Sequence, residues 1–137
     1  MTRYLRHFAT SLMLIGALCA SHAAVGKEWP EKQVRIVLPY PPGGASDVTA
    51  RLLGNKMGQA WGETVVVDNK PGANGIIANE AVAKSAADGY TILMANLGPN
   101  GINPAVYSKL PYDTVKDFAP VILTTTVPLV IVTSADS

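Results

Sequence analysis

Residues 34–47 read VRIVLPYPPGGASD, and this stretch decides the fold class. Its first five residues are a short β-branched run, apolar except for Arg35, which is typical of a buried strand. The Pro/Gly segment that follows ends the strand in a tight turn. A helical pattern begins directly after the turn, so residues 34–61 predict a strand, a loop and a helix in that order.

The predicted helix has apolar residues that recur on one face. We expect that face to pack inward, through Val48, Leu52, Leu53, Met57, Ala60 and Trp61. Ser46 or Asp47 is the expected N-cap, because either side chain can accept a bond from a first-turn N–H. Gly62 is the expected end, because glycine readily adopts the left-handed conformation that closes many helices.

The alternation of strand and helix continues along the chain. Strands are predicted at residues 64–67 and 90–95, with a helix at 76–87 between them. Further elements are expected in three places: a short helix at 105–108 and strand-like runs at 121–125 and 129–133. Strands that alternate with helices indicate an α/β fold with a mostly parallel sheet flanked by helices.

Residues 1–23 have the composition of a secretory signal peptide. Two arginines precede residues 8–19, an apolar core that is too short to span a bilayer, and residues 21–23 (SHA) have the small-x-small pattern of a cleavage site. We therefore predict a signal peptide at 1–23 that is cleaved after Ala23. An amphipathic or buried N-terminal helix is the alternative.

Charge and composition exclude several classes of function. The whole chain has 11 basic and 10 acidic residues, and cleavage would leave nine basic residues and a net charge of −1. Such a chain has no strong field for nucleic acid or an anionic membrane. Cleavage would also remove the single cysteine and both histidines, and with them disulfides, zinc sites, thiol nucleophiles and histidine bases. Carboxylate chemistry and oxygen-only metal sites stay open, although no nucleophile–base pair can be assembled.

Three Pro/Gly-rich loops, at residues 39–47, 69–75 and 96–104, each follow a predicted strand. Because the carboxyl ends of parallel strands lie at one edge of a sheet, we expect the loops to lie together where ligands of such folds bind. Gly43-Gly44 before a helix start would leave free N–H groups that attract an anion. An ordinary turn is the alternative interpretation of this pair and of residues 71–75.

Polar side chains in these loops could complete a site. Asn96, Asn100 and Asn103 could donate amides to a carboxylate, or could bond their own backbone instead. Asp47 would repel an anion, so we interpret it as a loop organiser rather than a catalytic acid. Tyr40 could form an aromatic wall. Together the loops predict a small-anion cradle built from neutral donors.

These residues resemble the Bug family, the periplasmic substrate-binding proteins of tripartite tricarboxylate transporters. The resemblance starts at PYPPGGASD (39–47), continues through NKPGANG (69–75) and ADGYT (87–91), and closes on VKDFAPV (115–121). It implies a type II periplasmic-binding-protein-like α/β lobe, one of two that close on a carboxylated small molecule. Because family members are considerably longer, we expect residues 24–137 to be an incomplete N-terminal lobe whose second lobe is absent.

Carried over by position, the resemblance implies a ligand held largely by backbone amides of the three loops. The implied ligand-binding residues are Tyr40, Gly43, Gly44, Ala45, Ser46, Asp47, Ala73, Asn74, Gly75, Asn96, Leu97, Gly98 and Asn100. No catalytic residue, metal, cofactor or nucleic acid partner is implied. The expected partners are a small carboxylate and membrane transporter subunits, and the expected receptor is periplasmic and monomeric.

Two alternative functions stay open at this point. One is a small secreted hydrolase that uses carboxylates around Asp47. The other is a truncated chain without function, whose apolar run near residues 121–132 would drive aggregation.

Overall fold

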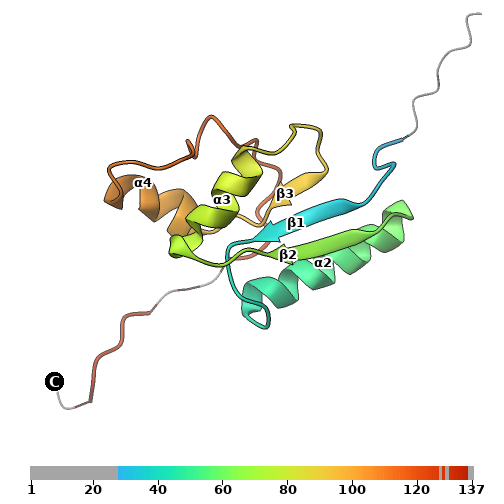
Figure 1. Cartoon of the computed structure of the whole chain (residues 1–137). Coiled ribbons are helices and arrows are strands. Elements are labelled where there is room, and N and C mark those ends of the chain that lie inside the picture. The colour runs from blue at the N-terminus through green and yellow to red at the C-terminus, as the bar shows by residue number, and fades with distance from the viewer. Residues whose placement is uncertain (1–27, 127, 129, 136–137) are drawn as a thin grey trace, which may run out of the picture. The chain divides into compact units, whose positions relative to one another are not determined.

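The structure is a computed structural model that describes residues 28–126, 128 and 130–135 (Figure 1). The chain divides into two units, Met1–Glu31 and Lys32–Ser137, and every element named below belongs to the second unit. The signal peptide predicted at residues 1–23 lies outside the described residues. Within the described ranges, no helix combines the length and the apolar character that a membrane crossing requires.

A three-stranded parallel sheet carries the other elements. Strand β1 (Val34–Leu38) lies between β2 (Val65–Asn69) and β3 (Thr91–Leu93), and it pairs with both in the parallel direction. The centre suits β1 because its apolar run can be buried on both faces, and four of its five residues are buried. The predicted α/β class and parallel sheet are confirmed, and β1 has the predicted bounds.

Two helices cover opposite faces of this sheet. Helix α2 (Ala45–Trp61) connects β1 to β2, and α3 (Ile76–Ala83) connects β2 to β3 on the other side of β1. The two crossovers run in opposite directions along the sheet, so the right-handed rule places their helices on opposite faces. Figure 1 shows α2 and α3 on the two sides of the strands.

Helix α2 begins earlier than the sequence predicts. Its N-cap is Gly44, whose backbone is extended (φ −81°, ψ 171°) and which has no side-chain cap bond. The prediction of Ser46 or Asp47 as N-cap is therefore wrong: both lie inside the first turn, and the Asp47 carboxylate accepts a bond from the N–H of Gly43 instead. Gly62 ends the helix as predicted, with φ 72° and its N–H donating to the Gly58 carbonyl.

The face of α2 that meets the sheet differs from the predicted apolar stripe. Val48 and Leu52 are 61% and 62% exposed, whereas the buried residues of the helix are Asp47, Ala50 and Gly54. A Cβ on Gly54 would lie 3.3 Å from Cγ1 of Val65, so small residues allow the helix to approach β2 closely. Met57 of the predicted stripe does pack against the core, so the stripe is confirmed in part, while small residues occupy the fully buried positions apart from Asp47.

Helix α3 and strand β3 are shorter than predicted. The turn η1 (Ala73–Gly75) leads into α3, which ends at Ala83 rather than at residue 87. The N–H and the hydroxyl of Ser85 both donate to the Val82 carbonyl, at 2.9 and 2.7 Å, and this local bonding closes the helix. Strand β3 covers only the middle of the predicted 90–95 run.

The segment expected to be a loop at 96–104 is largely helical. One π-helical turn, η2 (Gly98–Ile102), runs into α4 (Asn103–Val106), so the prediction of a loop is wrong for most of 96–104. The short helix expected at 105–108 is present, but it begins two residues earlier. The N–H of Asn100 donates to the Asn96 carbonyl, and the Asn100 side chain accepts a bond from the Asn96 N–H, both at 3.1 Å. These turn-forming asparagines therefore close a helical turn.

The predicted strands at 121–125 and 129–133 are also wrong for the described residues of those ranges, which have no strand. Val121, Ile122 and Leu123 are about four-fifths exposed, at 86%, 79% and 81%. A strand needs a hydrogen-bonded neighbour, and the sheet of the described part contains only β1, β2 and β3. The apolar pattern is present, but its pairing partner is not in this sheet.

Candidate anion-binding site

The three predicted loops come together at one edge of the sheet. β1, β2 and β3 run in the same direction, so the segments that follow them leave from the same edge. A Cβ on Gly75 in the second loop would lie 2.9 Å from Pro99 in the third loop and 3.0 Å from Pro39 in the first. All three loops therefore meet at Gly75.

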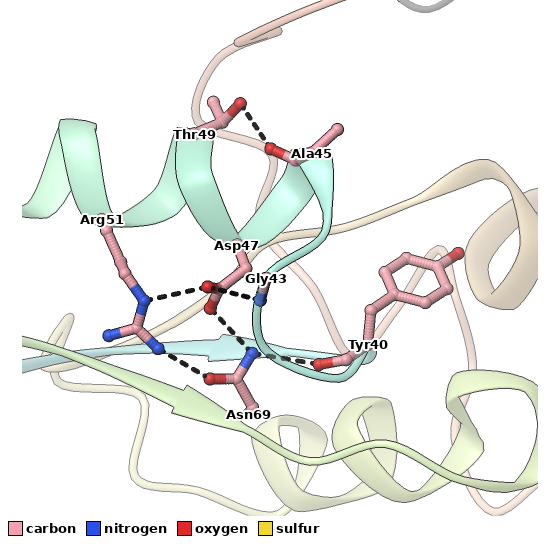
Figure 2. Close-up of polar contacts among 7 residues, drawn as sticks. All are labelled: Tyr40, Gly43, Ala45, Asp47, Thr49, Arg51 and Asn69. Atoms are coloured by element: carbon pink, nitrogen blue, oxygen red, sulfur yellow. Dashed lines mark hydrogen bonds and ion pairs between the residues drawn. The ribbon is translucent and has the colours of Figure 1, made fainter.

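Asp47 holds the first loop in shape, as Figure 2 shows. Its Oδ2 accepts bonds from the Gly43 N–H at 3.0 Å and from Arg51 Nε at 2.9 Å. Its Oδ1 accepts from Asn69 Nδ2 at 3.0 Å, and the same amide donates to the Tyr40 carbonyl at 3.0 Å. Arg51 Nη2 donates to Asn69 Oδ1 at 3.1 Å, so the first loop, α2 and the end of β2 share one set of polar contacts.

These contacts keep Asp47 ionised. The bond from Arg51, followed by those from the Gly43 N–H and the Asn69 amide, holds the pKa of Asp47 well below its ordinary value of 3.8. The bond to Asp47 in turn raises the pKa of Arg51. A carboxylate of such low basicity is a poor proton acceptor near neutral pH. The geometry of Asp47, which is 4% exposed, is that of a loop organiser.

The start of α2 leaves backbone N–H groups for a ligand. Its first intrahelical bond runs from the Val48 N–H to the Gly44 carbonyl at 3.0 Å, so the N–H groups of Ala45, Ser46 and Asp47 have no acceptor within the helix. Gly44 and Ala45 are exposed, and Ser46 is half-buried. The dipole of this 17-residue helix adds positive potential at the same end. Such an open helix start can bind an anion.

The second loop is a left-handed turn. Four successive residues have positive φ: 124° at Gly72, 47° at Ala73, 50° at Asn74 and 82° at Gly75. A left-handed backbone costs a non-glycine residue about 1–2 kcal/mol. Ala73 and Asn74, both exposed, therefore adopt a conformation that the surrounding structure must stabilise.

The asparagines of the third loop bond to the other loops and to α3. Asn96 Nδ2 donates to Ser46 Oγ at 3.5 Å, and Asn100 Nδ2 donates to an asparagine of α3 at 2.8 Å. Asn103, which is fully buried, accepts a bond from Asn74 Nδ2 at 2.6 Å and donates to the Asn74 carbonyl at 3.1 Å. These amides link the loops to one another, so fewer of their donors are available to a ligand.

The predicted ligand-binding residues differ in accessibility. Those that are exposed or half-buried are Tyr40, Gly43, Gly44, Ala45, Ser46, Ala73, Asn74, Asn96, Leu97, Gly98 and Asn100. Asp47 and Gly75 are buried, the first within its polar contacts and the second between two prolines. The contact of each of these residues with a ligand stays a prediction.

Three supporting residues were missed from the sequence. Arg51 stands four residues after Asp47 on α2, and this spacing for an ion pair is visible in the sequence. Asn69 is the last residue of β2, where polar side chains of parallel strands meet a ligand edge. Asn79 is a polar residue in an Ala-rich helix, but its burial could not be inferred without the packing of α3.

A separate hollow of about 590 Å³ is lined by residues between 104 and 117. It includes none of the predicted ligand-binding residues. Asp113 in its wall accepts bonds from the N–H groups of Val115 and Lys116 at 2.9 and 3.1 Å, and Lys116 Nζ lies 3.4 Å from its other oxygen. Its carboxylate therefore serves the local turn.

A parallel α/β sheet with an open helix start and three loops at its carboxyl edge defines a class, the lobes of periplasmic solute-binding proteins, and solved lobes of that class match this fold. The chain belongs to the tripartite tricarboxylate transporter receptor family, whose model matches residues 49–137. The resemblance to the Bug family is thereby confirmed.

Relatives with known sequences agree with this assignment. The chain is 43% identical, over 109 residues and 80% of its length, to a protein from the tcbD–tcbE intergenic region of Pseudomonas sp. strain P51, of which it covers 32%. It is 40% identical to the protein BugT of Bordetella pertussis over 77% of its own length and 33% of BugT. The chain thus spans about a third of the length of these curated relatives.

Two solved structures match at comparable levels. One is the R. palustris protein Rpa4515 with adipate, 41% identical with a TM-score of 0.67, over 69% of this chain and 32% of that one. The other is MatC from Rhodopseudomonas palustris with bound malate, 38% identical with a TM-score of 0.66, over 70% of this chain and 33% of that one.

Proposed function

We propose that this chain is a lobe of an extracytoplasmic receptor that binds a small carboxylate and delivers it to the membrane subunits of a tripartite tricarboxylate transporter. The receptor reaches the periplasm through a cleaved signal peptide at residues 1–23 and works as a monomer. It binds its ligand without a metal or cofactor and catalyses no reaction.

The observation that carries this proposal is the open start of α2. The N–H groups of the exposed residues Gly44 and Ala45 and of the half-buried Ser46 hold the ligand carboxylate, with the helix dipole adding to the attraction. Asp47 does not oppose an anion here, because Arg51 Nε lies 2.9 Å from its carboxylate and balances the charge. The ligand therefore meets neutral N–H donors, and the net charge of the nearby Asp47–Arg51 pair is close to zero.

The other two loops form the remaining walls of this half of the site. A Cβ on Gly98 would lie 3.7 Å from the Tyr40 hydroxyl, so the Tyr40 ring and the third loop border the same space. The second loop contributes Ala73, Asn74 and Gly75, and the third contributes Asn96, Leu97, Gly98 and Asn100. The adipate and malate of the two similar structures support a dicarboxylate as the ligand.

The N–H of Ala45 can be tested because the helix does not need it. Proline is favoured at a first helical position such as Ala45, and Gly44 is extended, as the residue before a proline must be. We expect Ala45→Pro to leave Tm nearly unchanged. Binding of adipate or malate should weaken about tenfold or more, because a hydrogen bond to a charged group contributes about 1.5–3 kcal/mol.

Isothermal titration with both dicarboxylates, on the full-length receptor, measures this effect. Ala45→Ser retains the N–H and is the matched control, which should bind as tightly as the wild type. A folded Ala45→Pro protein with wild-type affinity would contradict the role of the α2 amides.

A further inference from the structure

Two asparagines beneath the loops are wholly buried. Asn79 on α3 and Asn103 at the start of α4 have no exposed surface. Asn79 Nδ2 donates to the Gly75 carbonyl at 2.9 Å, and its Oδ1 accepts a bond from Asn100 Nδ2 at 2.8 Å. This single side chain therefore ties the end of the second loop to the third loop.

Asn103 makes a second tie between the same two loops. Its Nδ2 donates to the Asn74 carbonyl at 3.1 Å, and its Oδ1 accepts from Asn74 Nδ2 at 2.6 Å. Across the residues that the structure describes, no buried side-chain nitrogen or oxygen lacks a partner. An amide suits both positions because it offers a donor and an acceptor, whereas an ionised aspartate of the same size lacks the donor and leucine lacks both.

The tied residues belong to the left-handed turn of the second loop. Ala73 and Asn74 have φ of 47° and 50°, a region that a Cβ atom disfavours. The bonds from Asn79 and Asn103 reach the last two residues of that turn, Asn74 and Gly75. Without them the turn would lose its side-chain anchors to the third loop and could relax toward a right-handed backbone.

We propose that Asn79 and Asn103 are positioning residues of the anion site. They touch no ligand, because they are fully buried, and they fix the second loop against the third so that the exposed residues of both loops keep their places. This inference rests on the proposed carboxylate-binding function. Neutral amides suit the position, because a buried carboxylate there without a paired cation would repel an anionic ligand at low dielectric.

The test replaces each amide by an apolar side chain of similar shape, in Asn79→Leu and Asn103→Leu. Val34→Ala is the matched control: Val34 is fully buried at the amino end of β1, the end opposite the loops, so its loss destabilises the fold without touching them. Two readouts are taken on full-length folded protein. One is the affinity for adipate and malate by titration, and the other is amide hydrogen exchange at Gly75, Ile76 and Asn100, whose N–H groups are bonded within the loops.

Both leucine variants should bind the dicarboxylates at least about tenfold more weakly and should exchange faster at the three amides. Val34→Ala should lower Tm while retaining wild-type affinity and loop exchange. The proposal is overturned if folded leucine variants bind and exchange as the wild type does. It is also overturned if Val34→Ala weakens binding as much as they do at a matched loss of Tm.

If the leucine variants fail to fold, Asn74→Gly is tested in their place. Only hydrogen exchange is measured for this variant, because Asn74 is itself a predicted ligand residue and its loss could change the affinity directly. Glycine accepts the left-handed backbone and removes the side-chain bond to Asn103. Faster exchange at Gly75 and Ile76 would support the tie, and wild-type rates would overturn it. A wild-type receptor that binds no carboxylate would refute the proposed function. The exchange rates of the variants would still test whether the two asparagines hold the loops in place.

Discussion

Asp47 is a buried charge whose contacts all serve the first loop. It accepts bonds from a backbone N–H, a guanidinium and an amide, and these donors come from the loop, from α2 and from the end of β2. A buried carboxylate is tolerated only when it is paired and hydrogen-bonded in this way. A residue in the first turn of the helix that faces the anion site is therefore itself an anion, with its charge already balanced.

Asp47→Asn should destabilise the protein at neutral pH, and the deficit should shrink in acid. The folded-state pKa of Asp47 lies below its ordinary value of 3.8, so its stabilisation is fully present above that value and is lost as the pH falls toward the lower one. Thermal unfolding of both proteins between about pH 7 and pH 2 measures the difference, which should narrow below about pH 4.

Two other carboxylates provide an internal control for this comparison. Backbone N–H bonds, first from Tyr90 for Asp88 and from Val115 for Asp113, also lower the pKa of each group. Both residues are present in the wild type and in the variant, so their titration cancels in the difference. A difference in Tm that stays constant down to the acid end would contradict the role given to Asp47.

At the scale of elements, the connection between β2 and α3 depends on Gly75. It has φ of 82° and lies against prolines of the other two loops, with no room for a Cβ. Gly62 at the end of α2 has φ of 72°, but a Cβ there would meet nothing within 4 Å. The two glycines share a backbone conformation and differ in crowding.

Gly75→Ala should therefore destabilise more than Gly62→Ala. The left-handed backbone alone costs alanine about 1–2 kcal/mol, which is the effect expected at Gly62. Overpacking adds about 1–3 kcal/mol at Gly75, for a total of roughly 2–5 kcal/mol. Urea unfolding of the two variants measures both free energies, and equal losses would show that the three loops do not pack at Gly75 as described.

At the scale of the whole molecule, the chain covers about a third of its curated relatives. Most of its described residues between 121 and 132 are apolar and they are largely exposed, with Val121 86%, Ile131 103% and Val132 82% accessible. The described sheet offers this run no neighbouring strand. Exposed apolar segments of this kind promote association with other surfaces.

The 137-residue chain by itself should bind dicarboxylates weakly. A ligand enclosed between two lobes has most of its surface buried, whereas one lobe provides half of the contacts. Titration of this chain and of a full-length relative with the same ligand, at equal salt, compares the two affinities. Tight binding by the chain alone would contradict the proposal that two lobes are needed to enclose the ligand.

Much of the architecture follows from local sequence. Four of the five residues 34–38 are apolar and the run is rich in β-branched residues, which favours a strand covered on both faces, and its bounds are as predicted. Gly62 closes α2 because few other residues adopt its backbone conformation. The alternation of strands and helices also implies that three loops share one edge, and this required no knowledge of packing.

Tertiary structure alone decided the features that depend on contacts with other segments, such as burial and strand pairing. The closeness of β2 to Gly54 set which small residues of α2 are fully buried, and only part of the predicted apolar face, such as Met57, packs against the core. The same is true of the strands expected beyond residue 120, whose described residues have no neighbour in the sheet of β1, β2 and β3, and of Asn79 and Asn103, whose burial comes from elements distant in the chain. The sequence by itself determined the local conformations and their order, because backbone sterics and apolar runs act over a few residues. Burial and hydrogen-bond partners were decided by the tertiary structure, because both depend on which segments meet in space.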